Sequence, residues 1–185
     1  PDSREGAIFF YHETAVYPPG IQHAVDRYLS VLNTISGISP LGAPDSPPDF
    51  GFVLPNDAIA EADRLCGEAG YLLFSPLARH AQKMWVDNRW VDLAEVLSAR
   101  KLRIVVVGHG SSNFPGSGPA WTNLINRTSL PVLCAVISRA RLCVTVDSAP
   151  MHIAAALGVP VVALFGPTDP SKVGPYIRRR MILRG

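Results

Sequence analysis

The sequence predicts an α/β protein with a doubly wound parallel sheet, and three observations support this. From residue 50 onward, short apolar runs alternate with segments of helical periodicity, as they do when each strand is followed by a crossover helix. The runs 102–107 and 143–146 are β-branched and apolar on both faces, which is typical of strands buried between two helical layers. Turns rich in Gly, Pro and Ser separate the segments. We expect these two runs to be central strands.

The first 49 residues are predicted to form a lead-in segment that precedes the compact domain. Residues 7–11 are apolar and predict a short strand, and apolar residues recur at helical spacing over 21–35, which predicts a helix. The stretch 37–49 is rich in Pro, Gly and Ser and predicts an interdomain linker. The division is therefore a lead-in over 1–49 and a domain over 50–185.

Within the domain, each predicted strand is followed by a loop or a helix. Loops are expected at 76–88 and 108–119. The expected helices cover 57–68, 89–100, 129–139 and 149–158. The expected strands cover 52–54, 71–75, 102–107, 142–146, 160–165 and 181–184.

Composition fits one domain with a buried core and excludes several classes of protein. Of 185 residues, 48% are hydrophobic and 17% charged, which suits a buried sheet and argues against disorder. A net charge of +2 without a binding-module signature predicts no nucleic-acid partner. No apolar run reaches about 18 residues, so we expect no transmembrane segment. Cys66, Cys134 and Cys143 are odd in number and lack C-x-x-C spacing, which fits a reducing, cytoplasmic setting. Cys134 and Cys143 lie in apolar periodic segments and are predicted to be core thiols.

Polar residues gather where the strand 142–146 ends. Asp147 and Ser148 are the residue types that close a strand and cap the following helix, and Pro150 suits its first turn. The carboxyl edge of an open parallel sheet is where ligands bind. We expect Asp147 to cap the helix, and Lys83, Asp147, Ser148 and His152 to converge at this edge.

Three motifs carry a resemblance to a known family. They are D-S-A-P-M-H at 147–152, F-G-P-T-D-P at 165–170, and the loop 76–90, in which Lys83 stands two residues before Trp85. Together they resemble the nucleotide-sugar-binding half of the lipopolysaccharide heptosyltransferases, glycosyltransferase family 9, and most of all the heptosyltransferase I branch. The resemblance implies the C-terminal half of a GT-B enzyme, which is built from two Rossmann-like domains.

The resemblance also implies a reaction and a set of site residues. The reaction is the transfer of heptose, with inversion, from ADP-heptose to a lipopolysaccharide inner-core acceptor. No metal and no cofactor are implied. Lys83 and His152 are the implied catalytic residues, and Asp147 is assigned to sugar hydroxyls or to positioning. The implied donor-binding residues are Ala78, Arg79, Lys83, Asp147, Ser148, Ala149, His152, Thr168 and Asp169.

The general base is expected to lie outside this chain. In the resembling family it comes from an N-terminal domain, which also binds the lipid-anchored acceptor, so we expect the chain to be a fragment that catalyses little alone. The full-length protein is expected at the inner face of the cytoplasmic membrane, with peripheral association.

Other readings of the sequence stay open. A transferase or epimerase that uses a UDP-sugar has the same architecture, and a non-catalytic nucleotide-sugar-binding module is a different class. Gly108 and Gly110 follow a strong strand, but the third glycine of a dinucleotide fingerprint is absent. The arginines 178–180 are interpreted as a solvated turn before a strand.

Overall fold

The structure is a computed structural model that describes residues 19–36, 50–177 and 179–185. The chain divides into two compact units, residues 1–46 with 171–173 and residues 47–170 with 174–185, and each is taken by itself. In the first unit, α1 (Ala24–Ser36) confirms the helix predicted over 21–35. The strand predicted at 7–11 and the linker predicted at 37–49 lie outside the described residues.

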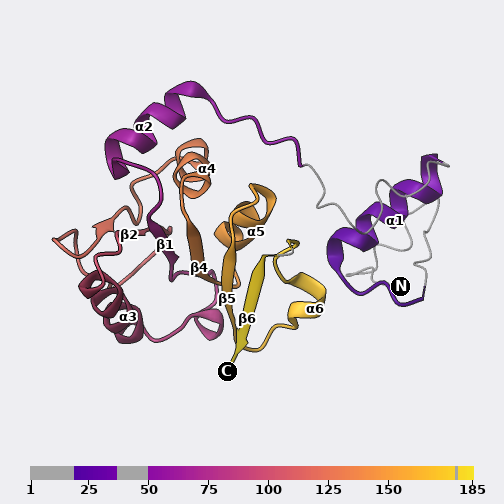
Figure 1. Ribbon diagram of the computed structural model, residues 1–185. Helices are drawn as coiled ribbons and strands as arrows, with labels where there is room; N and C mark the ends of the chain where they lie inside the picture. The colour runs from indigo at the N-terminus through magenta and orange to yellow at the C-terminus, as the bar shows by residue number, and fades with distance from the viewer. Residues whose placement is uncertain (1–18, 37–49, 178) are drawn as a thin grey trace. The chain divides into compact units, whose positions relative to one another are not determined.

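The second unit is built on a six-stranded sheet, shown in Figure 1. All neighbouring strands are parallel, which confirms the predicted fold class. The order is β3-β2-β1-β4-β5-β6, so the chain moves outward from β1 in one direction and from β4 in the other. The strands are β1 (Leu72–Ser75), β2 (Ile104–Val106), β3 (Thr122–Asn123), β4 (Leu142–Val146), β5 (Val161–Phe165) and β6 (Arg180–Arg184).

The prediction for the central strands was wrong in one respect. Run 142–146 is central as β4, but run 102–107 forms β2, one strand in from the edge, and β1 lies beside β4. The sequence pattern missed β3, a two-residue strand whose side chains are half-buried. Because β3 covers the outer side of β2, the backbone of β2 is paired on both sides, as a central strand would be.

The strand predicted at 52–54 is also wrong. These residues join no strand, and they lead to Pro55, the extended residue that begins α2 (Asn56–Cys66). Phe52 is 46% exposed and Val53 is 89% exposed. Strand preference is largely a preference for a half-buried, paired surface, and this segment has no strand partner and exposes Phe52 and Val53.

Helices lie on both faces of the sheet. Trp90 and Ala94 of α3 pack on Phe74 of β1 and its register partner Val144 of β4, so α3 covers the sheet face to which these two side chains point. Side chains one position further along point to the opposite face, where α2 packs on α4 and α4 on α5. The helices α2, α3 (Asp87–Ala99) and α4 (Leu130–Ser138) confirm those predicted, with ends within two residues, as does the start of α5 (Ala149–Ala156).

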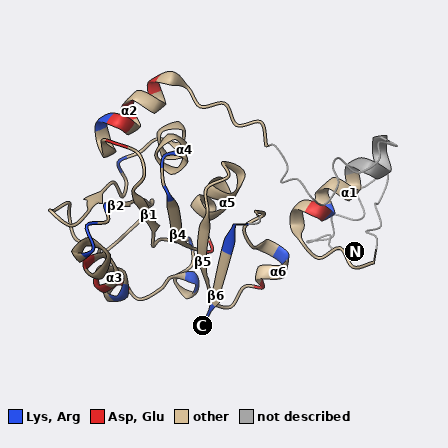
Figure 2. Ribbon diagram, in the orientation of Figure 1, with Lys and Arg blue, Asp and Glu red and all other residues tan. Residues whose placement is uncertain are grey.

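Cys134 and Cys143 are buried free thiols, which confirms the prediction of core thiols, and Cys66 is also buried and free. Cys143 is fully buried in β4, and burial raises the pKa of its thiol to about 12. Charges of both signs share the surface helices α2 and α3, as Figure 2 shows. Within the described residues, no helix is long and apolar enough to cross a membrane.

Candidate functional site

The site lies where the strand order reverses, between β1 and β4. The last residue of β1, Ser75, pairs in register with Thr145, next to the end of β4. The loops that follow these two strands therefore start side by side. In an open α/β sheet, this reversal is the place where ligands bind.

The loop after β1 carries Lys83 to the residue that follows β4. Lys83 ends a short 3-10 helix, η2 (Ala81–Lys83), and its Nζ donates to Asp147 Oδ2 at 2.6 Å. The two residues lie 64 positions apart in the sequence. Asp147 is only 6% exposed, whereas Lys83 is 26% exposed. The structure therefore confirms that the predicted pair Lys83 and Asp147 converges.

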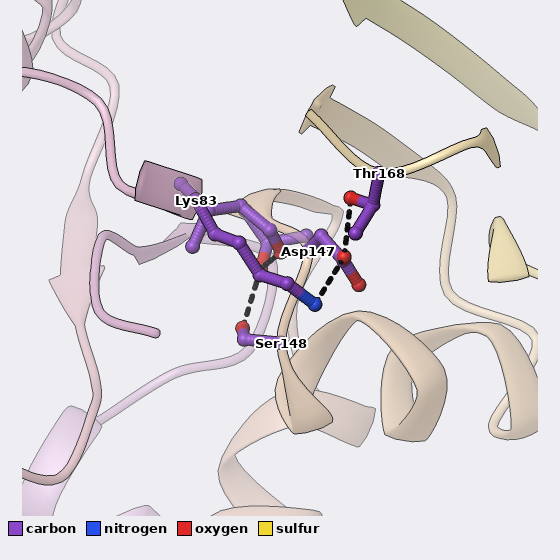
Figure 3. Close-up of polar contacts among 6 residues, drawn as sticks. Lys83, Asp147, Ser148 and Thr168 are labelled. Carbon is purple, nitrogen blue, oxygen red and sulfur yellow. Dashed lines mark hydrogen bonds and ion pairs between the residues drawn. The ribbon is translucent and has the colours of Figure 1, made fainter. Parts of the chain in front are cut away.

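The loop after β5 adds a third side chain. Thr168 Oγ1 donates to the same carboxylate oxygen, Asp147 Oδ2, at 2.7 Å. Figure 3 shows Lys83 and Thr168 approaching Asp147 from two different loops. Three loops that follow β1, β4 and β5 thus meet at one buried carboxylate.

Asp147 does not cap the helix, contrary to the sequence prediction. Ser148 is the N-cap residue of α5, with an extended backbone and no hydrogen bond from its own side chain to the helix. Its Oγ lies 3.4 Å from Thr145 Oγ1, a contact drawn in Figure 3. Asp147 stands one residue too early to cap, and Lys83 and Thr168 hold its carboxylate. The first N–H groups of α5 are consequently left without a side-chain cap.

The remaining predicted site residues lie on the same loops and helix. Ala78 is half-buried against the apolar cluster under α3, and Arg79 next to it is exposed. His152 is exposed at the fourth position of α5. Asp169 follows Thr168 and is exposed. Whether these residues reach one ligand stays a prediction.

A groove of about 360 Å³ opens beside Lys83, and the sequence did not predict it. Trp85, 37% exposed, forms one wall, and its ring packs edge-on against the buried Trp90 at 5.5 Å between centroids. The lining residues are Gln82, Lys83, Met84, Trp85, Leu164, Phe165, Gly166, Leu183, Arg184 and Gly185. In the part of the chain that the structure describes, no three His, Cys, Asp or Glu side chains cluster as metal ligands.

A parallel sheet of this order, with charged side chains at its reversal point, defines the class of Rossmann-like domains. The chain belongs to glycosyltransferase family 9 (heptosyltransferase), whose family model matches residues 1–185.

Curated relatives and solved structures agree with this assignment. The chain is 34% identical to lipopolysaccharide heptosyltransferase 1 of Pseudomonas aeruginosa, over 88% of this chain and 45% of that protein. It is 32% identical to lipopolysaccharide heptosyltransferase 3 of Escherichia coli K12, over 90% of this chain and 50% of that protein. The structure of E. coli heptosyltransferase WaaC with ADP superposes with a TM-score of 0.74 at 25% identity, over 97% of this chain and 55% of that one. The chain thus spans about half the length of the relatives it matches, as one half of a GT-B fold does.

Proposed function

We propose that this chain is the donor-binding half of a glycosyltransferase that transfers heptose, with inversion, from ADP-heptose to a lipopolysaccharide inner-core acceptor. The observation that carries the proposal is the contact of Lys83 and Thr168 with Asp147 at the reversal point of the sheet. Two solved structures of one relative support the donor: E. coli heptosyltransferase WaaC is described with ADP and with ADP-2-deoxy-2-fluoro heptose.

Lys83 is assigned to the leaving diphosphate. An ammonium carries three N–H donors, and Asp147 takes one, so two remain for phosphate oxygens. The first turn of α5, at Ser148 and Ala149, adds backbone N–H groups that no side chain caps. Negative charge grows on the diphosphate as the glycosidic bond breaks, and a donor placed in advance stabilises that charge.

Asp147 is assigned to sugar hydroxyls and to the positioning of Lys83. A carboxylate that faced the diphosphate would repel it, whereas a carboxylate has several lone pairs that can accept from hydroxyl groups. The contacts from Lys83 and Thr168 both use Oδ2. We further assign the edge of the donor site to the exposed or half-buried neighbours on these loops: Ala78, Arg79, His152, Thr168 and Asp169.

The acceptor and the general base are assigned to the other half of a full-length enzyme. Inversion needs deprotonation of the acceptor hydroxyl on the face opposite the diphosphate. We therefore expect this chain alone to bind the donor nucleotide and to catalyse little. Peripheral association at the inner membrane face, where a lipid-anchored acceptor would be met, belongs to the same proposal.

Calorimetric titration with ADP and UDP tests the donor assignment. We expect ADP to bind more tightly than UDP, and Lys83→Ala to weaken ADP binding by about tenfold, the size of one charge-assisted hydrogen bond at a partly exposed site. Lys172→Ala removes an exposed lysine from the short helix α6 (Pro170–Val173) and is the matched control, with no change expected. Equal binding of ADP and UDP would favour the UDP-sugar alternative. Unchanged ADP binding by Lys83→Ala would refute the phosphate role.

Turnover tests the catalytic part in a full-length enzyme that contains this chain. Lys83→Ala should lower kcat by about 100-fold, more than it lowers donor affinity, because the charge on the diphosphate increases in the transition state. His152→Ala should lower turnover with little change in melting temperature. A His152→Ala enzyme with normal turnover and a lower melting temperature would show a packing role instead.

A further inference from the structure

Gly166 makes a backbone contact that leaves no room for a side chain. A Cβ built on Gly166 would lie 2.7 Å from the carbonyl oxygen of Gln82, the residue immediately before Lys83. The φ of Gly166 is not among the positive values of this chain, so its backbone conformation is open to any residue. The close approach, and not the conformation, therefore requires glycine here.

This contact joins a firmly held segment to a weakly held one. Gly166 directly follows β5, which pairs with β4 on one side and β6 on the other. The short helix η2 contains no buried residue and is closed by two backbone bonds, from Lys83 N to His80 O and from Met84 N to Ala81 O. If a side chain at position 166 forces η2 away from the end of β5, η2 is therefore the segment that moves.

Lys83 lies between two fixed points of its loop. On one side, Gln82 rests on Gly166; on the other, Trp85 packs against the buried Trp90. The segment that contains Gly166 also supplies Thr168, which donates to Asp147. The loop after β5 consequently contacts Asp147 through the Thr168 hydroxyl and, through the backbone of Gly166, the residue immediately before Lys83.

We propose that Gly166 is a positioning residue: its missing side chain lets η2 approach the end of β5 closely enough to place Lys83 beside Asp147 and the donor phosphates. The inference rests on the proposed phosphate role of Lys83. An alanine at 166 would push the Gln82 carbonyl oxygen from 2.7 Å past 3.0 Å and toward 3.4 Å, where ordinary contact begins. With Trp85 held by Trp90, that displacement of up to about 0.7 Å falls on Lys83, and misplacements of about 1 Å are costly in sites of this kind.

The test is a double-mutant cycle on ADP affinity, measured by calorimetry on this chain. Gly166→Ala should weaken ADP binding by about fivefold, which is part of the roughly tenfold loss expected for Lys83→Ala. In the Lys83→Ala background, Gly166→Ala should add no further loss, because the group it displaces is gone. Gly116→Ala is the matched control: Gly116 has an ordinary φ and open space around its Cβ, so ADP affinity should not change.

The outcomes separate this inference from the proposed function. If Lys83→Ala leaves ADP binding unchanged, the phosphate role fails, and the inference fails with it. If Lys83→Ala weakens binding but Gly166→Ala does not, only the inference is overturned. A loss from Gly166→Ala that persists in the Lys83→Ala background would also overturn it, since a general structural effect is additive. So would a Gly166→Ala chain without the native near-ultraviolet circular dichroism, because Gly166 would then support the fold as a whole.

Discussion

The ion pair between Lys83 and Asp147 should stabilise the folded domain, because its carboxylate is buried. Asp147 is 6% exposed and Lys83 is 26% exposed. Lys83→Met removes the charge, keeps most of the apolar stem and leaves Thr168 as a donor to Asp147 Oδ2. A buried charged group that loses a partner costs about 1–3 kcal/mol, and partial exposure lowers the figure, so we expect a loss of about 1–2 kcal/mol.

A second substitution should recover much of this loss. Asp147→Asn removes the carboxylate charge and keeps an oxygen that can accept from Thr168. The double variant Lys83→Met/Asp147→Asn has no unpaired charge, so its free energy of unfolding should lie closer to that of the unmodified chain than Lys83→Met does. The expected coupling between the two positions is about 1 kcal/mol.

A second ion pair with the same N–O distance but greater exposure serves as the matched control. Arg64 and Glu61 on α2 also meet at 2.6 Å, but their side chains are 70% and 37% exposed. Arg64→Met should therefore leave the free energy of unfolding unchanged within error, since exposed pairs are screened by water and salt. The comparison isolates burial, because the two pairs have the same separation.

Urea unfolding followed by tryptophan fluorescence, under reducing conditions, measures all four variants. We expect Lys83→Met to be the least stable variant and Arg64→Met to be indistinguishable from the unmodified chain. A stabilising role for the buried pair is refuted if Lys83→Met lowers the free energy of unfolding no more than Arg64→Met does. It is also refuted if the loss in the double variant equals the sum of the losses in the two single variants.

Three further results are expected in other parts of the fold. Trp90→Ala should lower the free energy of unfolding by about 3–5 kcal/mol in the same urea assay, because Trp90 is fully buried against Phe74; a loss below about 1 kcal/mol would contradict that packing. The free energy of unfolding should fall as the pH rises from 9.0 toward 12, because the Cys143 thiol loses its proton in this range in the unfolded chain but keeps it in the folded chain, where its pKa is about 12. In urea titrations, Cys143→Ala should make the free energy of unfolding less dependent on pH in this range. Val53→Ser should change the melting temperature little, since Val53 is 89% exposed and unpaired, and a clear drop would show that residues 52–54 have a partner.

Much of the fold could be predicted from the sequence because its signals are local. Each β-branched run is long enough to indicate a strand by itself, and helical periodicity with Pro and Gly at the ends places the helices α2 to α5. The same signals placed Lys83 and Asp147 after strand ends. Since parallel strands share one carboxyl edge, these residues were expected to meet there, and they do.

The wrong predictions about strands have a common cause: a strand pairs with residues that are distant in the sequence, so its pairing cannot be read from the local sequence. Run 52–54 has strand composition but no neighbouring strand to bond with, whereas Thr122 and Asn123 are too short a run to indicate a strand and nevertheless pair with β2. The sequence could not show which strand lies beside β4, because that depends on where the long crossover through α4 returns. Local sequence indicates which segments form helices and strands, but the order of the strands in the sheet depends on tertiary packing.

The sequence by itself therefore determined the α/β class, the motifs that indicate family 9 and the residue types available at the sheet edge. Tertiary structure decided what those residues do to one another. Asp147 accepts from Lys83 and Thr168 where a helix cap was expected, and Gly166 is required by the carbonyl of Gln82, far from it in sequence. Hydrogen bonds and close backbone contacts of this kind depend on distances of a few tenths of an ångström between separate loops. Those distances are fixed once the sheet has formed, and no spacing along the chain encodes them.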